Sequence, residues 1–268
     1  METQFCALAS GSSGNCHVLA CGKETLLIDA GLSGRQIVQR MEKAGMDPAD
    51  LTGILVSHEH RDHIHGAGIL SRRFDIPVYA NVKTWTAMEN QLSPLPSAHQ
   101  RIFDSDRPFS IGEVQITPYR LSHDAEEPVG FVLETPGRKI CIATDLGIEP
   151  KGFHQLVQNA DLVVMESNHD VQMLQVGKYP YALKRRILSD KGHLSNETAG
   201  SLIGRMINVN VSAVLLAHLS QENNFPELAL STVVGVLAEK GIVPGRDLTL
   251  DVSLRNRASG LYHFDTGR

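Results

Sequence analysis

A short apolar run that ends in a cluster of histidines stands out in this chain: residues 53–63 read GILVSHEHRDH. The run Gly53–Ser57 predicts a buried strand. Directly after it come four side chains that bind borderline metals such as zinc, namely His58, His60, Asp62 and His63. The alternation of the first two points them in one direction, while the last two begin a helical turn and face a second ion. This stretch therefore predicts a strand end that binds metal.

Composition narrows the class of protein around this stretch. The chain has 268 residues, of which 42% are hydrophobic, and a net charge of −5. These values exclude a disordered chain, a collagen and a disulfide-stapled miniprotein. No apolar run approaches the roughly 20 residues that span a membrane, and the N-terminus lacks the features of a signal peptide. We therefore expect a soluble, cytoplasmic protein with no membrane partner, and the buried cysteines remain free thiols.

Charge and aromatic content bear on nucleic-acid binding. The acidic balance offers no global basic field, although it allows a local basic patch. The aromatic content of 5%, with a single Trp, argues against base-stacking platforms.

Strand-like and helix-like runs alternate along the whole chain. Strands are expected over residues 5–9, 17–20, 25–29, 53–57, 76–80, 114–119, 129–134, 139–143, 162–165, 213–217 and 248–252. Helices are expected over residues 33–44, 66–73, 197–208 and 227–240. No linker divides the sequence, so we predict one domain over residues 1–268. Its class is α/β (α+β), a four-layer αβ/βα sandwich of two mixed β-sheets flanked by helices.

Three further polar residues, His123, Asp145 and His218, each follow an apolar strand, and Asp29 ends an earlier one. In this order the set resembles the metallo-β-lactamase-fold superfamily of metallohydrolases. The resemblance implies two divalent metal ions, zinc, manganese or iron. It assigns His58, His60 and His123 to one ion, and Asp62, His63 and His218 to the other, with Asp145 between them. It also implies that Asp29 supports the histidine loop.

Five strings resemble the YycJ (WalJ) family within that fold: SGSSGN at 10–15, ESNHD at 166–170, YP at 179–180, GHLSN at 192–196 and HLSQENN at 218–224. The resemblance implies a 5′-to-3′ DNA exonuclease linked to mismatch repair. Such an enzyme uses a dinuclear metal centre and a bridging hydroxide, with DNA as its substrate.

The GHLS string also resembles the His-Ser-Thr element of tRNA 3′-processing nucleases. By this resemblance His193 is the general acid, oriented and kept protonated by Glu166, and Asp62 joins them in the catalytic set. The alternative is a loop histidine ahead of a helix that Ser195 or Asn196 caps.

Several residues are predicted to contact the substrate. Ser12, Ser13 and Asn15 lie in a glycine-rich turn whose backbone suits an anion, although a plain hairpin turn explains it equally well. Lys184 and Arg185 belong to a basic run that is otherwise a solvated helix face. The remaining candidates are Asn168, Asn223 and Asn224, the last two of which also suit a turn. For His169 a structural loop role is favoured over a substrate contact.

Two other functions stay open. A small-molecule, cyclic phosphodiesterase of the same fold would share the ligand set and suit the acidic charge. A non-catalytic metal-binding module would be expected to have lost ligands. The 72 residues between Asp145 and His218 leave no room for the large inserted domain of RNA-degrading members. The sequence leaves the oligomeric state open, a homodimer included.

Overall fold

The computed structural model describes residues 2–264, which form two compact units. Of the described chain, unit 1 comprises residues 2–120, 125–138 and 254–264, and unit 2 comprises residues 121–124 and 139–253. The single domain predicted over residues 1–268 remains a prediction. Within the described part of the chain, no helix is long and apolar enough to cross a membrane.

Unit 1 is built on a seven-stranded mixed sheet with the order β14-β1-β2-β3-β4-β5-β6. Pairing is antiparallel from β14 to β3 and parallel from β3 to β6. The strands are β1 (Thr3–Ala9), β2 (Cys16–Cys21), β3 (Glu24–Ile28), β4 (Gly53–Leu55), β5 (Val78–Ala80), β6 (Gln100–Ile102) and β14 (Ser259–Phe264). The change from antiparallel to parallel pairing at β3 brings the ends of β3 and β4 to one edge, where the histidine loop begins.

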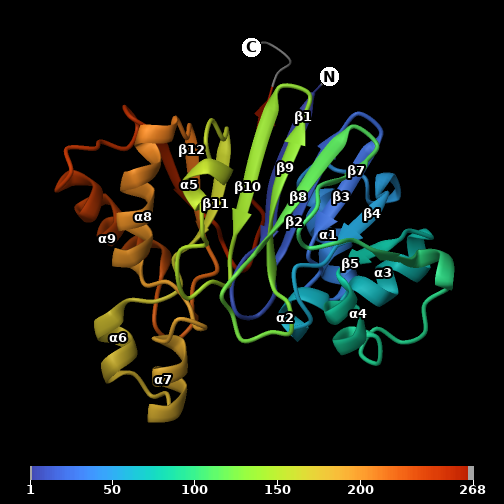
Figure 1. Ribbon diagram of the computed structural model, residues 1–268, viewed down its shortest axis with the longest axis horizontal. Coiled ribbons are helices and arrows are strands. Elements are labelled where there is room, and N and C mark those ends of the chain that lie inside the picture. The colour runs from blue at the N-terminus through green and yellow to red at the C-terminus, as the bar shows by residue number, and fades with distance from the viewer. Residues whose placement is uncertain (1, 265–268) are drawn as a thin grey trace. The chain divides into compact units, whose positions relative to one another are not determined.

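The helices of unit 1 lie along strands β3–β5 of this sheet (Figure 1). They are α1 (Gly34–Lys43), α2 (Arg61–Ile64), α3 (Ala67–Phe74) and α4 (Val82–Met88), with 3-10 turns at Pro48–Asp50 and Ser97–His99. Helix α1 begins where Ser33 and Gln36 form a capping box, and it buries Ile37 and Met41 in the core. The predicted helices over residues 33–44 and 66–73 thus correspond to α1 and α3.

Unit 1 also contains the antiparallel strands β7 (Phe109–Ile111), β8 (Val114–Arg120) and β9 (Val129–Thr135). The first residue of β9 is tied to the residue that precedes the histidine loop, because the Val129 N–H donates a hydrogen bond to the Ser57 carbonyl at 3.1 Å. Strand β4 is shorter than predicted, since the Ser57 N–H donates to the Asp29 side chain and not to a neighbouring strand.

Unit 2 is built on four parallel strands, β10 (Arg138–Ala143), β11 (Leu162–Glu166), β12 (Ala213–Ala217) and β13 (Thr249–Val252). Strands β10, β11 and β12 are buried over most or all of their length, as their continuous apolar runs predict, whereas the edge strand β13 has no buried residue. Carboxyl ends of parallel strands meet at one edge of a sheet. Asp145, Glu166 and His218 therefore lie at the same edge.

Five helices complete unit 2: α5 (Phe153–Leu156), α6 (Val171–Val176), α7 (Tyr181–Ile187), α8 (Asn196–Met206) and α9 (Pro226–Ala238), with a 3-10 turn at Ile207–Val209. Helices α8 and α9 pack on each other beside β12, whereas α6 and α7 extend past the carboxyl ends of the strands (Figure 1).

Candidate active site

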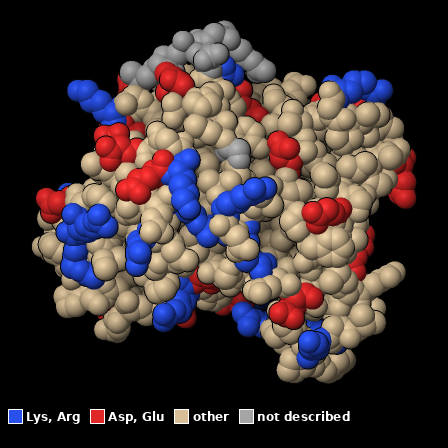
Figure 2. Space-filling model, turned by 180° about the vertical axis from the view of Figure 1, so that it is seen from behind, with Lys and Arg blue, Asp and Glu red and all other residues tan. Residues whose placement is uncertain are grey.

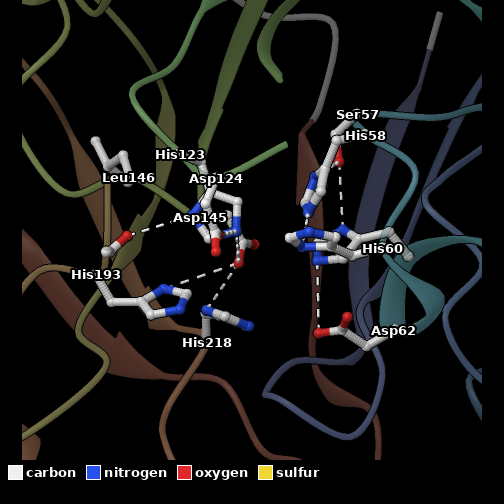
Figure 3. A network of polar contacts seen from close by, with 12 residues as sticks. Ser57, His58, His60, Asp62, His123, Asp124, Asp145, Leu146, His193 and His218 are labelled. Carbon is white, nitrogen blue, oxygen red and sulfur yellow. Dashed lines mark hydrogen bonds and ion pairs between the residues drawn. The ribbon is translucent and has the colours of Figure 1, made fainter. Parts of the chain in front are cut away.

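The histidine loop of unit 1 brings its metal-binding atoms together in pairs. His58 Nε2 lies 3.1 Å from His60 Nδ1, and His63 Nε2 lies 3.7 Å from Asp62 Oδ2. The rings of His58 and His63 are fully buried, and their centroids are 4.0 Å apart. Figure 3 shows Ser57, His58, His60 and Asp62 of this loop. The four potential ligands of this loop thus lie in two close pairs.

Asp29 holds this loop in place. One of its carboxylate oxygens accepts the Ser57 N–H at 2.8 Å, and the other contacts Ser57 Oγ at 2.8 Å and His63 Nδ1 at 2.7 Å. A carboxylate only accepts hydrogen bonds, so His63 donates from Nδ1 and its Nε2 carries the lone pair. The Ser57 hydroxyl donates to Asp29, which leaves its oxygen to accept from His58 Nδ1 at 3.0 Å. Ser57 was missed by sequence reasoning, and its place just before His58 was the only available signal.

The turn over residues 10–15 packs directly on the histidine loop. Asn15 is completely buried: its N–H donates to the Asp62 carbonyl at 2.8 Å, its Oδ1 accepts the Gly11 N–H at 2.9 Å, and its Nδ2 lies 3.0 Å from His63 Nε2. The backbones approach so closely that a side chain at Gly31 would collide with the Asp62 carbonyl. The substrate contact expected at Asn15 remains a prediction, and the amide is hydrogen-bonded inside the protein. Ser12 and Ser13 are exposed.

The strand ends of both units share a strained backbone. Asp29, Asp145 and His218 each follow a strand, and their φ angles are 59°, 60° and 56°. Left-handed conformations cost non-glycine residues about 1–3 kcal/mol and persist only where the surroundings enforce them. At each of these positions the left-handed backbone marks the point where the chain leaves the line of its strand.

In unit 2, Asp145 is the common neighbour of three histidines. Its Oδ1 lies 3.5 Å from His218 Nδ1, 3.7 Å from His123 Nε2 and 3.8 Å from His193 Nδ1. Figure 3 shows the rings of His193 and His218 turned toward this carboxylate. Burial lowers the pKa of His123 more than the Asp145 charge raises it, so this ring is held in the neutral form that binds metals.

Glu166, fully buried at the end of β11, organises this edge. Its Oε1 accepts from His218 Nδ1 at 2.7 Å and from His193 Nδ1 at 2.9 Å. Backbone N–H groups of Asp145, Leu146 and Leu194 donate to the same carboxylate. Burial by itself would raise the pKa of Glu166, but the His193 charge and these hydrogen bonds outweigh it and lower the pKa. The carboxylate stays ionised and fixes two histidines at once.

His193 is the most accessible ring in this group. Its side chain is 17% exposed, compared with 2% for His123 and His218. Since Nδ1 faces Glu166, Nε2 is the ring nitrogen that this carboxylate does not contact. Ser195 caps α8 by accepting the Thr198 N–H, as the alternative interpretation expected, but His193 has its own partner in Glu166.

Two asparagines predicted to contact the substrate brace loops of unit 2 instead. Asn168 donates to the His218 carbonyl at 2.9 Å. Asn224 donates to the carbonyls of Ser167 and Asn168 and pairs with the side chain of Asn196. Both are buried, and their substrate contacts remain predictions. The Asn223 side chain is also buried, and its Oδ1 has no hydrogen-bond partner among the described residues.

His169 is buried with neither ring nitrogen hydrogen-bonded within residues 2–264. Burial lowers its pKa to about 4, against the opposing charge of Glu166. The ring is therefore neutral near pH 7.

The basic residues of α7 differ in what they contact. Arg186 pairs with Asp124, next to His123, and Lys184 donates from Nζ to the Gln175 carbonyl at 2.7 Å. Lys184 therefore joins α7 to α6, and its substrate contact remains a prediction. Arg185 is exposed. Elsewhere, Lys and Arg side chains lie interspersed with Asp and Glu over the face drawn in Figure 2, in keeping with the acidic net charge.

The donor chemistry in each unit suits divalent metals. In unit 1, the Nδ1 atoms of His58 and His63 are already hydrogen-bonded, and His60 and Asp62 add a further imidazole and a carboxylate. In unit 2, ligand atoms of Asp145, Glu166, His193 and His218 lie within 4.8 Å of one another. Histidine nitrogens held by carboxylates are the usual arrangement around zinc and similar ions. The residues present therefore fit the metal ions that the sequence predicts.

Comparisons with known proteins agree with this geometry. Residues 24–219 match the model of the beta-lactamase superfamily domain. The metallo-beta-lactamase fold protein YhfI from Bacillus subtilis shares the fold, with a TM-score of 0.72 and 16% identity over 98% of this chain and all of that one. Exodeoxyribonuclease YycJ of Bacillus anthracis is 42% identical over 91% of this chain and 93% of its own length. Exodeoxyribonuclease WalJ of Streptococcus pneumoniae D39 is 41% identical over 91% of each chain.

The chain therefore belongs to the metallo-β-lactamase superfamily of hydrolases and, within it, to the family of YycJ and WalJ. The predicted fold class, two mixed β-sheets flanked by helices, is confirmed, and so is the prediction that the chain is an enzyme.

Proposed function

We propose that this chain is a metal-dependent phosphodiesterase that degrades DNA from the 5′ end. The observation that carries the proposal is the Glu166 carboxylate bonded to His193 and His218 together. This arrangement supplies a metal ligand and a proton donor at one strand edge, and phosphodiester hydrolysis needs both. The relatives that are 41–42% identical and named exodeoxyribonucleases favour DNA as the substrate.

The proposal assigns two divalent ions, zinc or manganese and alternatively iron, to one centre. His58, His60 and His123 would hold one ion, Asp62, His63 and His218 the other, and Asp145 would be shared. When bound, such a pair supplies an activated water near neutral pH and offsets charge on the phosphate.

The side chains around these ligands have distinct tasks in the proposal. Asp29 and Ser57 fix the tautomers of His63 and His58, and Glu166 does the same for His218. Glu166 also stabilises the protonated ring of His193, which donates its Nε2 proton to the departing 3′-oxygen. The exposure of His193 lets solvent return that proton.

The proposal keeps the substrate contacts expected from the sequence, and the exposed ones among them are the most accessible to DNA. Ser12 and Ser13 stand at the tip of the turn over residues 10–15, and Arg185 stands on α7. Each can donate hydrogen bonds to phosphate oxygens. A cytoplasmic location and a role in DNA repair are part of the same proposal, on the strength of the family resemblance.

The experiment that tests the proposal is digestion of end-labelled DNA, single-stranded and duplex, with zinc, manganese or iron added to chelator-treated protein. Release of mononucleotides from the 5′ end is expected. Hydrolysis of cyclic ribose phosphates with intact DNA would instead identify a small-molecule phosphodiesterase. Metal binding without hydrolysis of either substrate would identify the chain as a non-catalytic metal-binding module.

A further inference from the structure

The hairpin of α6 and α7, residues 171–189, differs in charge from the rest of the chain. It carries Lys178, Lys184, Arg185 and Arg186 and no acidic residue, although the chain as a whole has a net charge of −5. Tyr181 at the start of α7 is 76% exposed. Large aromatic side chains on a surface, surrounded by positive charge, are typical of surfaces that hold unpaired nucleic-acid strands.

The structure separates the cations of this hairpin by what they contact. Arg186 and Lys184 are engaged by Asp124 and by the Gln175 carbonyl. Arg185, one turn after Tyr181, places its guanidinium 6.0 Å from the centre of the tyrosine ring. A cation at this distance stacks on one face of the ring. Because the ring is mostly exposed, its other face is open to a ligand.

The same hairpin is joined to the proposed acid. The His193 N–H donates to the Ile187 carbonyl, the last residue of α7, at 3.0 Å. A side chain at Gly192 would collide with that carbonyl, so the His193 loop and the end of α7 are in direct contact. Arg186 reaches Asp124, the neighbour of His123. Tyr181 and Arg185 thus stand on a helix whose far end is anchored beside the chemistry.

Resting on the proposed function, we propose that Tyr181 is a stacking platform for an unpaired base of the DNA substrate, and that Arg185 binds the adjacent phosphate. Bases inside a duplex hide their faces in the stack, so an open tyrosine face favours single-stranded DNA. The low aromatic content of the chain predicted no stacking platform, but a single exposed ring beside the site is enough for one base. The arrangement would retain a frayed or unwound strand between successive cleavage events.

The test compares Tyr181→Ala, Tyr181→Phe and Arg185→Gln in the metal-loaded enzyme. Val176→Ala is the matched control, because Val176 is an 87% exposed, non-aromatic residue of the same hairpin. Binding is measured with a phosphorothioate single strand that resists cleavage, and KM and kcat with an ordinary strand. A nitrophenyl methyl phosphodiester, too small to reach Tyr181, reports on the chemistry alone.

Tyr181→Ala is expected to raise Kd and KM for single-stranded DNA by roughly 5- to 150-fold, the effect of losing one base–aromatic stack. Tyr181→Phe and Val176→Ala should leave Kd and KM close to the wild-type values. Hydrolysis of the small diester should stay at the wild-type rate in all three of these variants. Arg185→Gln should lower the slope of log K against log salt by roughly 0.7, the value for one phosphate contact on a single strand.

Equal losses on duplex and single-stranded DNA would overturn the stacking of an unpaired base. So would an unchanged Kd in Tyr181→Ala. Failure of the proposed function looks different: wild-type enzyme would then hydrolyse the small diester but neither cleave DNA nor bind the phosphorothioate strand, whatever residue stands at position 181.

Discussion

Two buried carboxylates, Asp29 in unit 1 and Glu166 in unit 2, organise the two groups of ligands in different ways. Asp29 accepts from one histidine and from Ser57, all within a loop that begins at the next strand end. Glu166 accepts from two histidines and three backbone N–H groups. Asp29 therefore supports a local loop, whereas Glu166 joins segments that follow strand β10, helix α7 and strand β12. Loss of Glu166 should damage more than one function, and loss of Asp29 only one.

The largest effect is expected at the residue that neighbours three histidines. Asp145→Asn removes the carboxylate charge that would be shared by both ions, so turnover should fall to background and metal content should drop with it. Elemental analysis of the purified variant, alongside the DNA assay, checks both. Full metal content with full activity would remove Asp145 from the ligand set.

Glu166→Gln should affect metal binding and proton donation together. The amide has no charge to stabilise protonated His193, and it presents N–H₂ to groups that already donate. We expect turnover to fall at least as far as in His193→Ala, and metal affinity to fall roughly 10- to 100-fold. Urea unfolding of the same variant measures the structural part of the loss. A variant with normal metal affinity would show that His218 is held without Glu166.

His193→Ala separates the acid from the metal ligands. Both metals should remain, while turnover on DNA falls by roughly 10²- to 10⁴-fold, the contribution of general acid catalysis. The loss should shrink on a nitrophenyl diester, whose leaving oxygen needs no proton. An equal loss on both substrates would make His193 a residue that positions the phosphate.

Asp29→Asn tests the simpler half of the comparison. Metal affinity should weaken by roughly 10- to 100-fold, the usual effect of a residue that orients a ligand. At saturating metal, turnover should recover, unlike in Glu166→Gln. Turnover is measured against metal concentration for Asp29→Asn and Glu166→Gln in parallel. Identical titration curves would show that the two carboxylates have the same role.

His169 is a buried histidine of unit 2 near Glu166. Its pKa falls from the ordinary 6.5 to about 4 on folding, so the unfolded chain binds a proton that the folded chain refuses. Stability is therefore lost as the pH falls from about 6.5 toward 4. Between about pH 7 and pH 5 this amounts to roughly 2 kcal/mol. His169→Leu should remove that share of the pH dependence, measured by urea unfolding of chelator-treated protein. An unchanged pH dependence would show that the ring finds a partner in solution.

Much of the fold follows from local pattern. The apolar runs that became β4, β10, β11 and β12 were recognisable because a buried parallel strand has few polar positions along its length. The candidate ligands at their ends were recognisable for the same reason, since a polar residue directly after such a run marks the sheet edge. Glu166 was identified as a partner of His193 by resemblance, but its bond to His218 was not expected.

The sequence by itself determined which residue types stand at the strand ends, because strand periodicity and metal-ligand chemistry are local properties. Only the tertiary structure decided how each polar group is used. Asn15, Asn168 and Asn224 carry the same groups that a substrate contact would need, yet they are buried and hydrogen-bonded to other parts of the chain. Tyr181 is the opposite case, because its exposure in the structure is what makes its ring accessible to a substrate. Buried hydrogen-bonding groups are almost always paired. Which partner each group finds depends on the packing between segments far apart in the chain.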